Sequence, residues 1–225
     1  MRGKLIVIEG TDCSGKETQT NLLMKKLTEF GMRVEKFSFP NYQSPTGKII
    51  GGPYLGKSYI GDSWFGEGAP KVDPKVAALY YAADRKYNIY KITFLLENGV
   101  NVILDRYVYS NMAHQGGKII DSKEREQLYN WLETLEFDLL ELPHADIKIF
   151  LHMPFEQAKV LKQNREESAD GHEKDEEHLK SAEAAYIELA EKYQFKTIEC
   201  TNGDNIKTIE EIHQELMEYL LEECK

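Results

Sequence analysis

Glycines and a lysine near the N-terminus have a spacing that could bind phosphate. In "EGTDCSGKET" (9–18), Gly10, Gly15 and Lys16 match the pattern G-x-x-x-x-G-K. Backbone N–H groups of such a loop can surround a phosphate, and Lys16 would add positive charge at the β- and γ-phosphates of a nucleotide. The pattern usually ends with a Ser or Thr that binds Mg²⁺, but Glu17 stands there. A plain tight turn is the alternative, and the lysine together with the flanking elements favours the phosphate site.

A carboxylate and an arginine follow a second apolar run. "NVILD" (101–105) ends at Asp105, and Arg106 comes next. Ligands of open α/β sheets collect at the carboxyl ends of the strands, so Asp105 could hold Mg²⁺ or its waters near the phosphates. Arg106 could bind two oxygens of a second phosphate at once. Asp105 could instead only cap the next turn, but that alternative leaves Arg106 unexplained.

These residues need strands that end beside one another, and the rest of the sequence predicts such strands. Short apolar runs rich in β-branched residues predict strands, and apolar residues at helical spacing predict helices between them. The predicted strands cover 4–10, 33–39, 101–105, 145–153 and 195–200. The predicted helices cover 16–30, 74–98, 122–137, 182–193 and 206–221, with another opening at Pro154 and a short one near 46–54. This alternation predicts an α/β fold of three layers, with a mostly parallel five-stranded sheet and helices on both faces.

Composition limits the classes of protein that fit. With 225 residues, the chain is long enough for one domain, 1–225, with a small mobile lid. Lys and Arg total 28 against 38 Asp and Glu, and the net charge of −10 argues against nucleic acid as a partner. No apolar run is long enough for a signal peptide or a membrane span, so we expect no membrane partner. The three cysteines are scattered and suggest no disulfide framework, which favours the reducing cytoplasm.

Several separated motifs resemble those of the thymidylate kinase family, P-loop kinases that phosphorylate dTMP with ATP. The longest match, "DRYVYSNMAHQGGK" (105–118), is similar to the family signature D-R-Y-x-x-S-x-x-A-Y-Q-G. Further matches are "GTDCSGK" (10–16), "FP" (39–40), "YYAADR" (80–85) and "LPHADIKIFLHMPFEQA" (142–158). The resemblance runs from about Lys4 to Tyr193, nearly the whole chain. It implies the P-loop NTPase fold, transfer of the γ-phosphate of ATP to dTMP to give dTDP and ADP, a need for Mg²⁺, and a homodimer.

The resemblance implies roles for residues on the ATP side. Asp12 is the family's acidic third loop residue, which lies near the 3′-hydroxyl of dTMP and in some members near Mg²⁺. The ATP phosphates would contact Gly10, Asp12, Cys13, Ser14, Gly15, Lys16, Glu17 and Thr18. The catalytic residues would be Lys16, Asp12, Arg106 and Arg165, and the candidate Mg²⁺ ligands are Asp12, Asp105 and Glu17.

On the dTMP side, the resemblance agrees with what the residue types can do. Tyr81 offers a flat face for stacking on a base, and Arg85, one helical turn later, could donate to the O4 acceptor of thymine. Ser110 and Asn111 could hydrogen-bond the base edge. Singly, these residues have simpler explanations, such as a core tyrosine, a surface ion pair or a helix cap. The implied dTMP site comprises Asp12, Phe39, Pro40, Tyr81, Arg85, Arg106, Ser110, Asn111, His114 and Gln115.

A charged segment with almost no apolar residues, "NREESADGHEKDEEH" (164–178), falls where the family has its lid. We place the lid at about 162–178, and a solvated linker is the alternative for most of that length. Cys13 stands where some members have a loop arginine, and in members without it, lid arginines supply the catalytic charge. Arg165 is therefore the candidate for the catalytic charge of the lid, and Lys162 and Lys174 are the next candidates.

Three departures from the family pattern leave questions open. Glu17 replaces the Mg²⁺-binding hydroxyl, and Asn41 and Tyr42 stand where many members place an arginine. His114 replaces an aromatic residue that packs near the sugar C2′ and helps to reject ribonucleotides. Two alternatives therefore remain: a related nucleoside-monophosphate or deoxynucleoside kinase of different base preference, and a weakly catalytic nucleotide-binding module.

Overall fold

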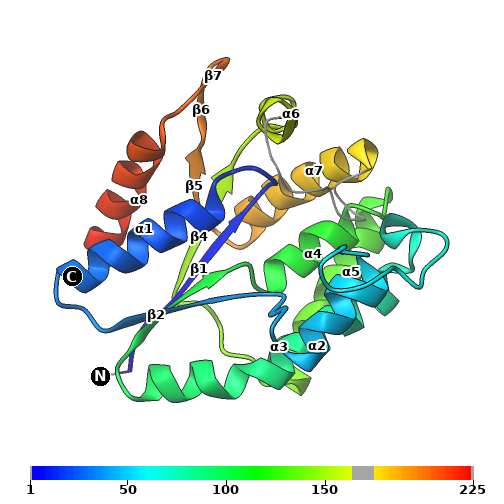
Figure 1. Ribbon diagram of the computed structural model, residues 1–225, viewed down its shortest axis with the longest axis horizontal. Coiled ribbons are helices and arrows are strands. Elements are labelled where there is room, and N and C mark those ends of the chain that lie inside the picture. The colour runs from blue at the N-terminus through cyan, green and yellow to red at the C-terminus, as the bar shows by residue number, and fades with distance from the viewer. Residues whose placement is uncertain (1, 164–174, 224–225) are drawn as a thin grey trace.

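A computed structural model describes residues 2–163 and 175–223 (Figure 1). Its centre is a five-stranded sheet with the order β2-β3-β1-β4-β5, in which every neighbouring pair is parallel. The strands are β1 (Leu5–Gly10), β2 (Val34–Ser38), β3 (Asn101–Asp105), β4 (Ile147–His152) and β5 (Lys196–Glu199). All five lie within the ranges expected from the sequence, and the predicted parallel sheet is confirmed.

Helices cover both faces of this sheet, as predicted (Figure 1). On one face, α1 (Lys16–Glu29) packs against α8 (Ile209–Glu223). The other face is covered by α3 (Pro74–Glu97), α4 (Val108–Gly116), α5 (Ser122–Glu133) and α7 (Glu176–Lys192). A further helix, α6 (Phe155–Gln163), follows β4. None of the helices in the described part of the chain is both long and apolar enough to cross a membrane.

The central strand β1 is buried along its whole length because helices lie above and below it. Its side chains alternate between two cores. Leu5 and Val7 belong to the core on the α3 side, whereas Ile6 and Ile8 belong to the core on the α1 side. This packing fixes Gly10, the last residue of β1, at the edge where the glycine-rich loop begins.

The structure also contains elements that the sequence did not predict. All residues of α4 except His114 are buried, so the helix shows no alternation of apolar and polar faces. A small antiparallel hairpin, β6 (Thr201–Asn202) and β7 (Asn205–Ile206), follows β5. α7 begins at Glu176, earlier than the predicted residue 182, and the Asp175 side chain caps it by accepting from the His178 N–H at 3.0 Å.

The predicted lid at 162–178 is described only at its ends. Residues 162–163 are the last of α6, and 176–178 lie in the first turn of α7, so the lid stays a prediction. Arg165 and Lys174 lie outside the described residues, and so does the side chain of Lys162.

The segment between β2 and α3 forms a small core of its own. The short helix expected near 46–54 is present as α2 (Pro45–Ile49), which continues into a π-helical turn, η1 (Ile50–Tyr54). A 3₁₀ turn, η2 (Ala69–Lys71), precedes α3. Lys118, just after α4, fastens this segment to the domain, because its ammonium donates to the carbonyl oxygens of Ala69 and Val72, each at 3.0 Å.

Candidate active site

The glycine-rich loop joins β1 to α1, and its two glycines are required for different reasons. A Cβ on Gly10 would lie 2.7 Å from the backbone oxygen of Leu151 and 2.6 Å from the Ser14 hydroxyl. Gly15 has a φ of +76°, a left-handed conformation that glycine adopts without strain. Gly15 also directly precedes the first residue of α1, so the helix N-terminus opens at the loop. The loop therefore has the form of a phosphate site.

Lys16 lies inside this loop and is only 8% exposed. Its ammonium donates to the Thr11 carbonyl oxygen at 2.8 Å and to the Ser14 hydroxyl at 3.4 Å. Burial, and then the positive charge of Arg106, lower the pKa of Lys16 to about 8. An anionic phosphate beside the ammonium would favour its charged form, so nucleotide binding and protonation of Lys16 support each other.

Arg106 connects the loop to two helices of the opposite layer. It follows β3 with a φ of +68°, an uncommon conformation for an arginine that places strain at this point. Its Nη2 pairs with Asp12 Oδ1 at 3.0 Å, while its Nη1 donates to the Ser110 hydroxyl at 3.2 Å and to the Tyr186 hydroxyl at 2.8 Å. Arg106 thus stands at the junction of the glycine-rich loop, α4 and α7.

Glu9 was not singled out in the sequence, although it supports this junction. The carboxylate is fully buried and accepts from the N–H groups of Tyr107, at 2.8 Å, and Ser110, at 3.1 Å. It therefore caps the first turn of α4, which has no cap of its own. Burial raises the pKa of Glu9. The Ser110 hydroxyl contacts Glu9, Arg106 and Tyr186, so Ser110 supports Arg106, and its contact with a base stays a prediction.

All ten residues proposed from the sequence for dTMP line one pocket, which we call the acceptor pocket. The pocket begins at Asp12 of the glycine-rich loop and extends between α3 and α4. Four further residues also line it: Tyr42, Leu55, Lys57 and Tyr107.

Arg85 lies in the wall of this pocket, in a pairing that the sequence did not reveal. Its Nε and Nη2 bind the two carboxylate oxygens of Glu136, and both side chains are at most 2% exposed. The surface ion pair considered as an alternative role for Arg85 is therefore wrong. Its Nη1 has a 3.5 Å contact with the Tyr107 carbonyl oxygen. A π-helical turn, η3 (Thr134–Leu139), carries Glu136 into the interior.

Two amide side chains in the same wall have polar atoms without hydrogen bonds among the described residues. The Asn111 amide nitrogen donates to the Ala78 carbonyl oxygen at 3.2 Å and to Glu136 at 3.1 Å, but its oxygen has no partner. Neither polar atom of the fully buried Gln115 side chain has one. Buried polar atoms are normally hydrogen-bonded, so these amides are candidates to pair with the donors and acceptors of a ligand.

Asp84, next to Arg85, holds the turn that begins the other wall of the pocket. This turn contains the cis peptide bond between Phe39 and Pro40. The Asp84 carboxylate is 1% exposed and accepts from the Asn41 N–H at 2.7 Å and the Ser44 hydroxyl at 2.9 Å. The adjacent residues of α3 thus perform separate tasks, since Asp84 fixes the turn while Arg85 faces Glu136.

His114, one of the departures, has a partner that the sequence did not suggest. Its Nδ1 lies 3.3 Å from Nε2 of His178, and the two rings are stacked with centroids 5.5 Å apart. The Tyr186 ring meets His114 edge-on. Because His178 is in the first turn of α7, the residue expected near the sugar is in contact with the helix that follows the charged segment.

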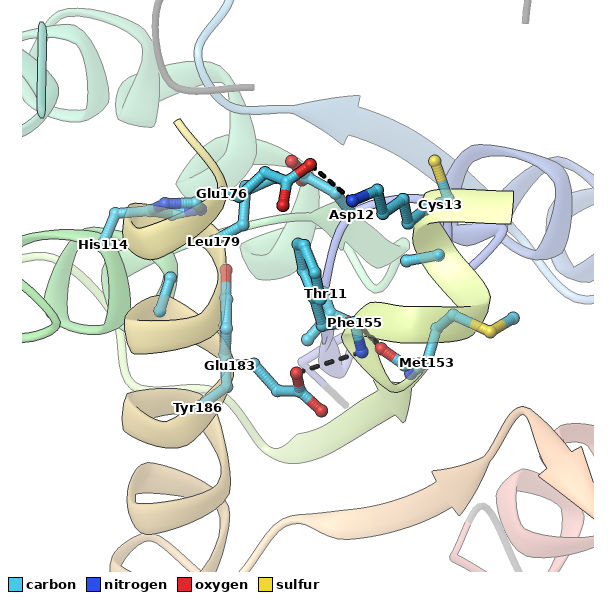
Figure 2. Close-up of a pocket in the computed structure, with 13 residues that line it drawn as sticks. Thr11, Asp12, Cys13, His114, Met153, Phe155, Glu176, Leu179, Glu183 and Tyr186 are labelled. Atoms are coloured by element: carbon cyan, nitrogen blue, oxygen red, sulfur yellow. Dashed lines mark hydrogen bonds and ion pairs between the residues drawn. The ribbon is translucent and has the colours of Figure 1, made fainter. Parts of the chain in front are cut away.

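A second pocket lies on the other side of His114 and is shown in Figure 2. The figure shows Thr11, Asp12 and Cys13 on one side and Glu176 and Glu183 of α7 on the other. An ion pair between Lys159 of α6 and Glu176, at 2.7 Å, connects the two helices beside this pocket. Asp12 and His114 line both pockets, so they lie between the pocket of Figure 2 and the acceptor pocket.

The three candidate Mg²⁺ ligands do not form a cluster. Asp12 is paired with Arg106, Glu17 is exposed, and Asp105 is 9% exposed at the end of β3. Within residues 2–163 and 175–223, no group of three His, Cys, Asp or Glu side chains could hold a metal ion. Mg²⁺ in phosphoryl-transfer sites is commonly held by one or two carboxylates together with substrate phosphates and water, and Asp105 and Asp12 fit that limited role.

A parallel sheet whose central strand runs into a glycine-rich loop, with a lysine held inside the loop, defines a P-loop nucleotide-binding protein. The family model for thymidylate kinase matches residues 8–216. The chain therefore belongs to the thymidylate kinase family.

Known relatives agree with this assignment. A protein of Methanocaldococcus jannaschii named "Probable thymidylate kinase" is 34% identical over 215 residues, which is 96% of this chain and 94% of the relative. The thymidylate kinase of Schizosaccharomyces pombe is 30% identical, with 96% and 91% covered, and the human enzyme is 28% identical, with 96% and 88% covered. The solved structure of thymidylate kinase from Candida albicans matches with a TM-score of 0.73 at 26% identity, covering 97% of this chain and 91% of that one.

Proposed function

We propose that this protein transfers the γ-phosphate of ATP to dTMP, giving dTDP and ADP. The observation that carries the proposal is the continuity between two sites. The glycine-rich loop with Lys16 suits the phosphates of ATP, and the acceptor pocket begins at Asp12 of the same loop. Arg106 touches Asp12 and lines the acceptor pocket, so it can bind a phosphate that faces the donor.

The polar groups of the acceptor pocket suit thymine. Arg85 can only donate, and the O4 atom of thymine can only accept. The Asn111 amide oxygen has no partner among the residues described, and the N3–H of thymine is a donor. Cytosine would instead present an amino donor to Arg85, at a cost of about 1–3 kcal/mol. Tyr81 lines the same pocket and can stack on the base.

Phosphoryl transfer depends mainly on positioning and on neutralising charge. Lys16 would neutralise the donor phosphates, and Arg106 the acceptor phosphate. Asp105 and Asp12 would hold Mg²⁺, which would supply further positive charge at the phosphates of ATP. The charge expected from Arg165 stays a prediction, because that residue lies outside the described ones.

An ADP-release assay over a panel of acceptors tests the proposal. The panel contains dTMP, dUMP, dCMP, dAMP, dGMP and thymidine, each with ATP and Mg²⁺. We expect dTMP to have the highest kcat/KM and dCMP to be at least tenfold poorer, because about 1.4 kcal/mol corresponds to tenfold. Fastest turnover of dCMP or dAMP, or of thymidine, would identify the alternative kinase. Nucleotide binding without turnover would identify the weakly catalytic module.

We also propose that the protein forms a homodimer through α3. Five large apolar side chains of this helix are between 43% and 75% exposed: Val76, Leu79, Tyr87, Tyr90 and Phe94. Their spacing places them along one side of a 24-residue helix, a length of about 36 Å. A continuous apolar stripe of this kind fits a second copy packed across a two-fold axis. Light scattering should give twice the chain mass, and Tyr90→Glu should give the monomer.

A cytoplasmic location is part of the same proposal. The buried Cys200 is a free thiol, which suits a reducing compartment. Fractionation of cells that express a tagged chain would test it, and recovery in a secreted fraction would contradict it.

A further inference from the structure

The Lys118 ammonium joins three segments of the chain. Lys118 comes just after α4, and its ammonium donates to the carbonyl oxygens of Ala69 in η2 and Val72 before α3, each at 3.0 Å. The ammonium also lies 3.4 Å from the hydroxyl of Tyr54 in η1 and 6.0 Å from the centroid of the Tyr54 ring. One cation therefore holds the end of α4, the residues before α3 and the end of η1 together.

Tyr54 connects this cation to the ring that is expected to stack on the base. Tyr54 is buried, and its hydroxyl donates to the same Ala69 carbonyl oxygen at 3.1 Å. Its ring meets the Tyr81 ring at 90°, with the two centroids 5.9 Å apart. Aromatic rings prefer such an edge-to-face arrangement, because the positive edge of one ring attracts the negative face of the other. The Tyr54 ring thus restrains the orientation of the Tyr81 ring.

The acceptor pocket takes residues from the segments that Lys118 holds. Leu55 directly follows η1, Tyr81 stands on α3, and both line the pocket. Val72 directly precedes Asp73, the residue whose side chain caps α3, so the contact at Val72 holds the start of the helix that carries Tyr81. A change at Lys118 should therefore alter the part of the pocket that meets the base.

We propose that Lys118 is a positioning residue for the acceptor base: through Tyr54 and the start of α3, it holds the Tyr81 ring in the orientation that stacks on the base. This inference rests on the proposed function. In this role Lys118 acts on the nucleoside part of the acceptor and contacts neither its phosphate nor ATP. A lysine suits the position because its three donors can reach separate acceptors while its charge attracts an aromatic ring.

Calorimetry on the full chain would measure thymidine, dTMP and ATP binding to the wild type and to Lys118→Met, which keeps the apolar stem and removes the charge. At pH 7 the wild-type ammonium is charged, because burial lowers the pKa of Lys118 only to about 8. We expect thymidine and dTMP to weaken by the same factor, about fivefold or more, since stacking on an aromatic ring contributes roughly 5- to 100-fold. ATP affinity should stay within about twofold. Lys118→Arg should restore most of the thymidine affinity, and Lys123→Met, an exposed lysine of α5, is the matched control.

A double-mutant cycle separates positioning from a general loss of stability. Tyr81→Leu removes the aromatic face, so adding Lys118→Met to it should weaken thymidine by less than about twofold more, because both changes act through the same ring. Losses that add independently in this cycle would overturn the inference and leave the proposed function standing. Unchanged thymidine affinity in Lys118→Met would do the same.

A second variant keeps the test decisive if Lys118→Met does not fold. Tyr54→Phe keeps the ring and removes the hydroxyl that contacts both Lys118 and Ala69. We expect Tyr54→Phe to weaken thymidine and dTMP alike, and unchanged affinity for both, with an unchanged thermal melt, would overturn the inference. A wild type that binds neither dTMP nor thymidine would refute the proposed function first, and the inference with it.

Discussion

Arg106 of the acceptor pocket donates a hydrogen bond of 2.8 Å from its Nη1 to the hydroxyl of Tyr186 on α7. The same hydroxyl lies 2.7 Å from that of Ser110. Because α7 is the helix that follows the charged segment, this contact links the position of α7 to the residue that would bind the acceptor phosphate.

Replacing Tyr186 with Phe should slow turnover more than it weakens dTMP binding. The change keeps the ring and removes the hydroxyl that steadies Arg106, a loss of about 1–1.5 kcal/mol, or roughly tenfold in kcat. Steady-state kinetics with a thermal melt would measure it. Tyr219→Phe on α8, across the sheet, is the control. A kcat equal to that of the wild type would show that the contact is not needed for turnover.

Lys16→Ala should nearly abolish activity and leave the fold intact. The Lys16 ammonium lies inside the glycine-rich loop, where it donates to the Thr11 carbonyl oxygen and the Ser14 hydroxyl. We expect kcat/KM to fall by about three orders of magnitude or more, since the loop lysine stabilises charge on the phosphates. The exposed neighbour Lys25→Ala should behave as the wild type. Near-normal turnover of Lys16→Ala with an unchanged melt would refute the phosphate-loop interpretation.

Arg165→Ala tests the predicted lid charge. A positioned arginine can contribute ~10³-fold or more in phosphoryl transfer, and Cys13 of the loop cannot replace it. A residue that acts after closure should lower kcat far more than ATP affinity. The measurement is kcat beside ATP binding, with Lys174→Ala as the comparison. A kcat within a few-fold of the wild type would move the role to Lys162 or Lys174, and a loss of affinity alone would make Arg165 a ground-state phosphate ligand.

His152 predicts how stability depends on pH. Its Nε2 lies 2.9 Å from Glu183 on α7 and its Nδ1 lies 2.8 Å from Glu199 on β5. The hydrogen bond to Glu183, followed by that to Glu199, raises the pKa of His152 against the opposing effect of burial. The protonated ring therefore stabilises the fold fully below its unfolded pKa of about 6.5, and this contribution is lost as pH rises through the raised folded pKa.

His152→Gln should accordingly cost about 1 kcal/mol at pH 6 and much less at pH 9, a modest figure because Glu199 is half exposed. Denaturant unfolding at the two pH values would measure this difference. His213, whose pKa is lowered by burial, should show the opposite trend in His213→Gln. A cost for His152→Gln that is equal at both pH values would mean that the ring acts in its neutral form.

The parts of the fold that follow local patterns could be predicted from the sequence. The strands were recognisable because both faces of the sheet are covered, so apolar runs such as the one ending at Gly10 stand out. The α4 helix could not be recognised, because almost every side chain in it is buried and its polar residues face the interior. Boundaries such as the start of α7 depended on the cap at Asp175, inside a charged run that gave no apolar signal.

For the candidate site, the sequence identified residues that carry motifs but not the residues that support them. Arg85 and Arg106 belong to recognisable motifs, whereas Glu136 and Tyr186 are separated from them by 51 and 80 residues. The sequence around a carboxylate or a tyrosine on a helix does not indicate which distant residue that side chain contacts. Glu9 and Asp84 were missed for another reason. Each lies next to a motif residue, but its carboxylate accepts from a backbone N–H of another segment of the chain.

The buried pair of Arg85 and Glu136 also constrains how this sequence can evolve. Loss of either side chain alone would leave an uncompensated charge in the interior, a cost of about 3–5 kcal/mol in a fold whose total stability is about 5–15 kcal/mol. Replacement of both by neutral side chains would avoid that cost but would remove the Arg85 donor on which the proposed recognition of thymine depends. Most single substitutions at either position should therefore be eliminated by selection. Positions 85 and 136, which lie 51 residues apart, should therefore be conserved together among related sequences or change together.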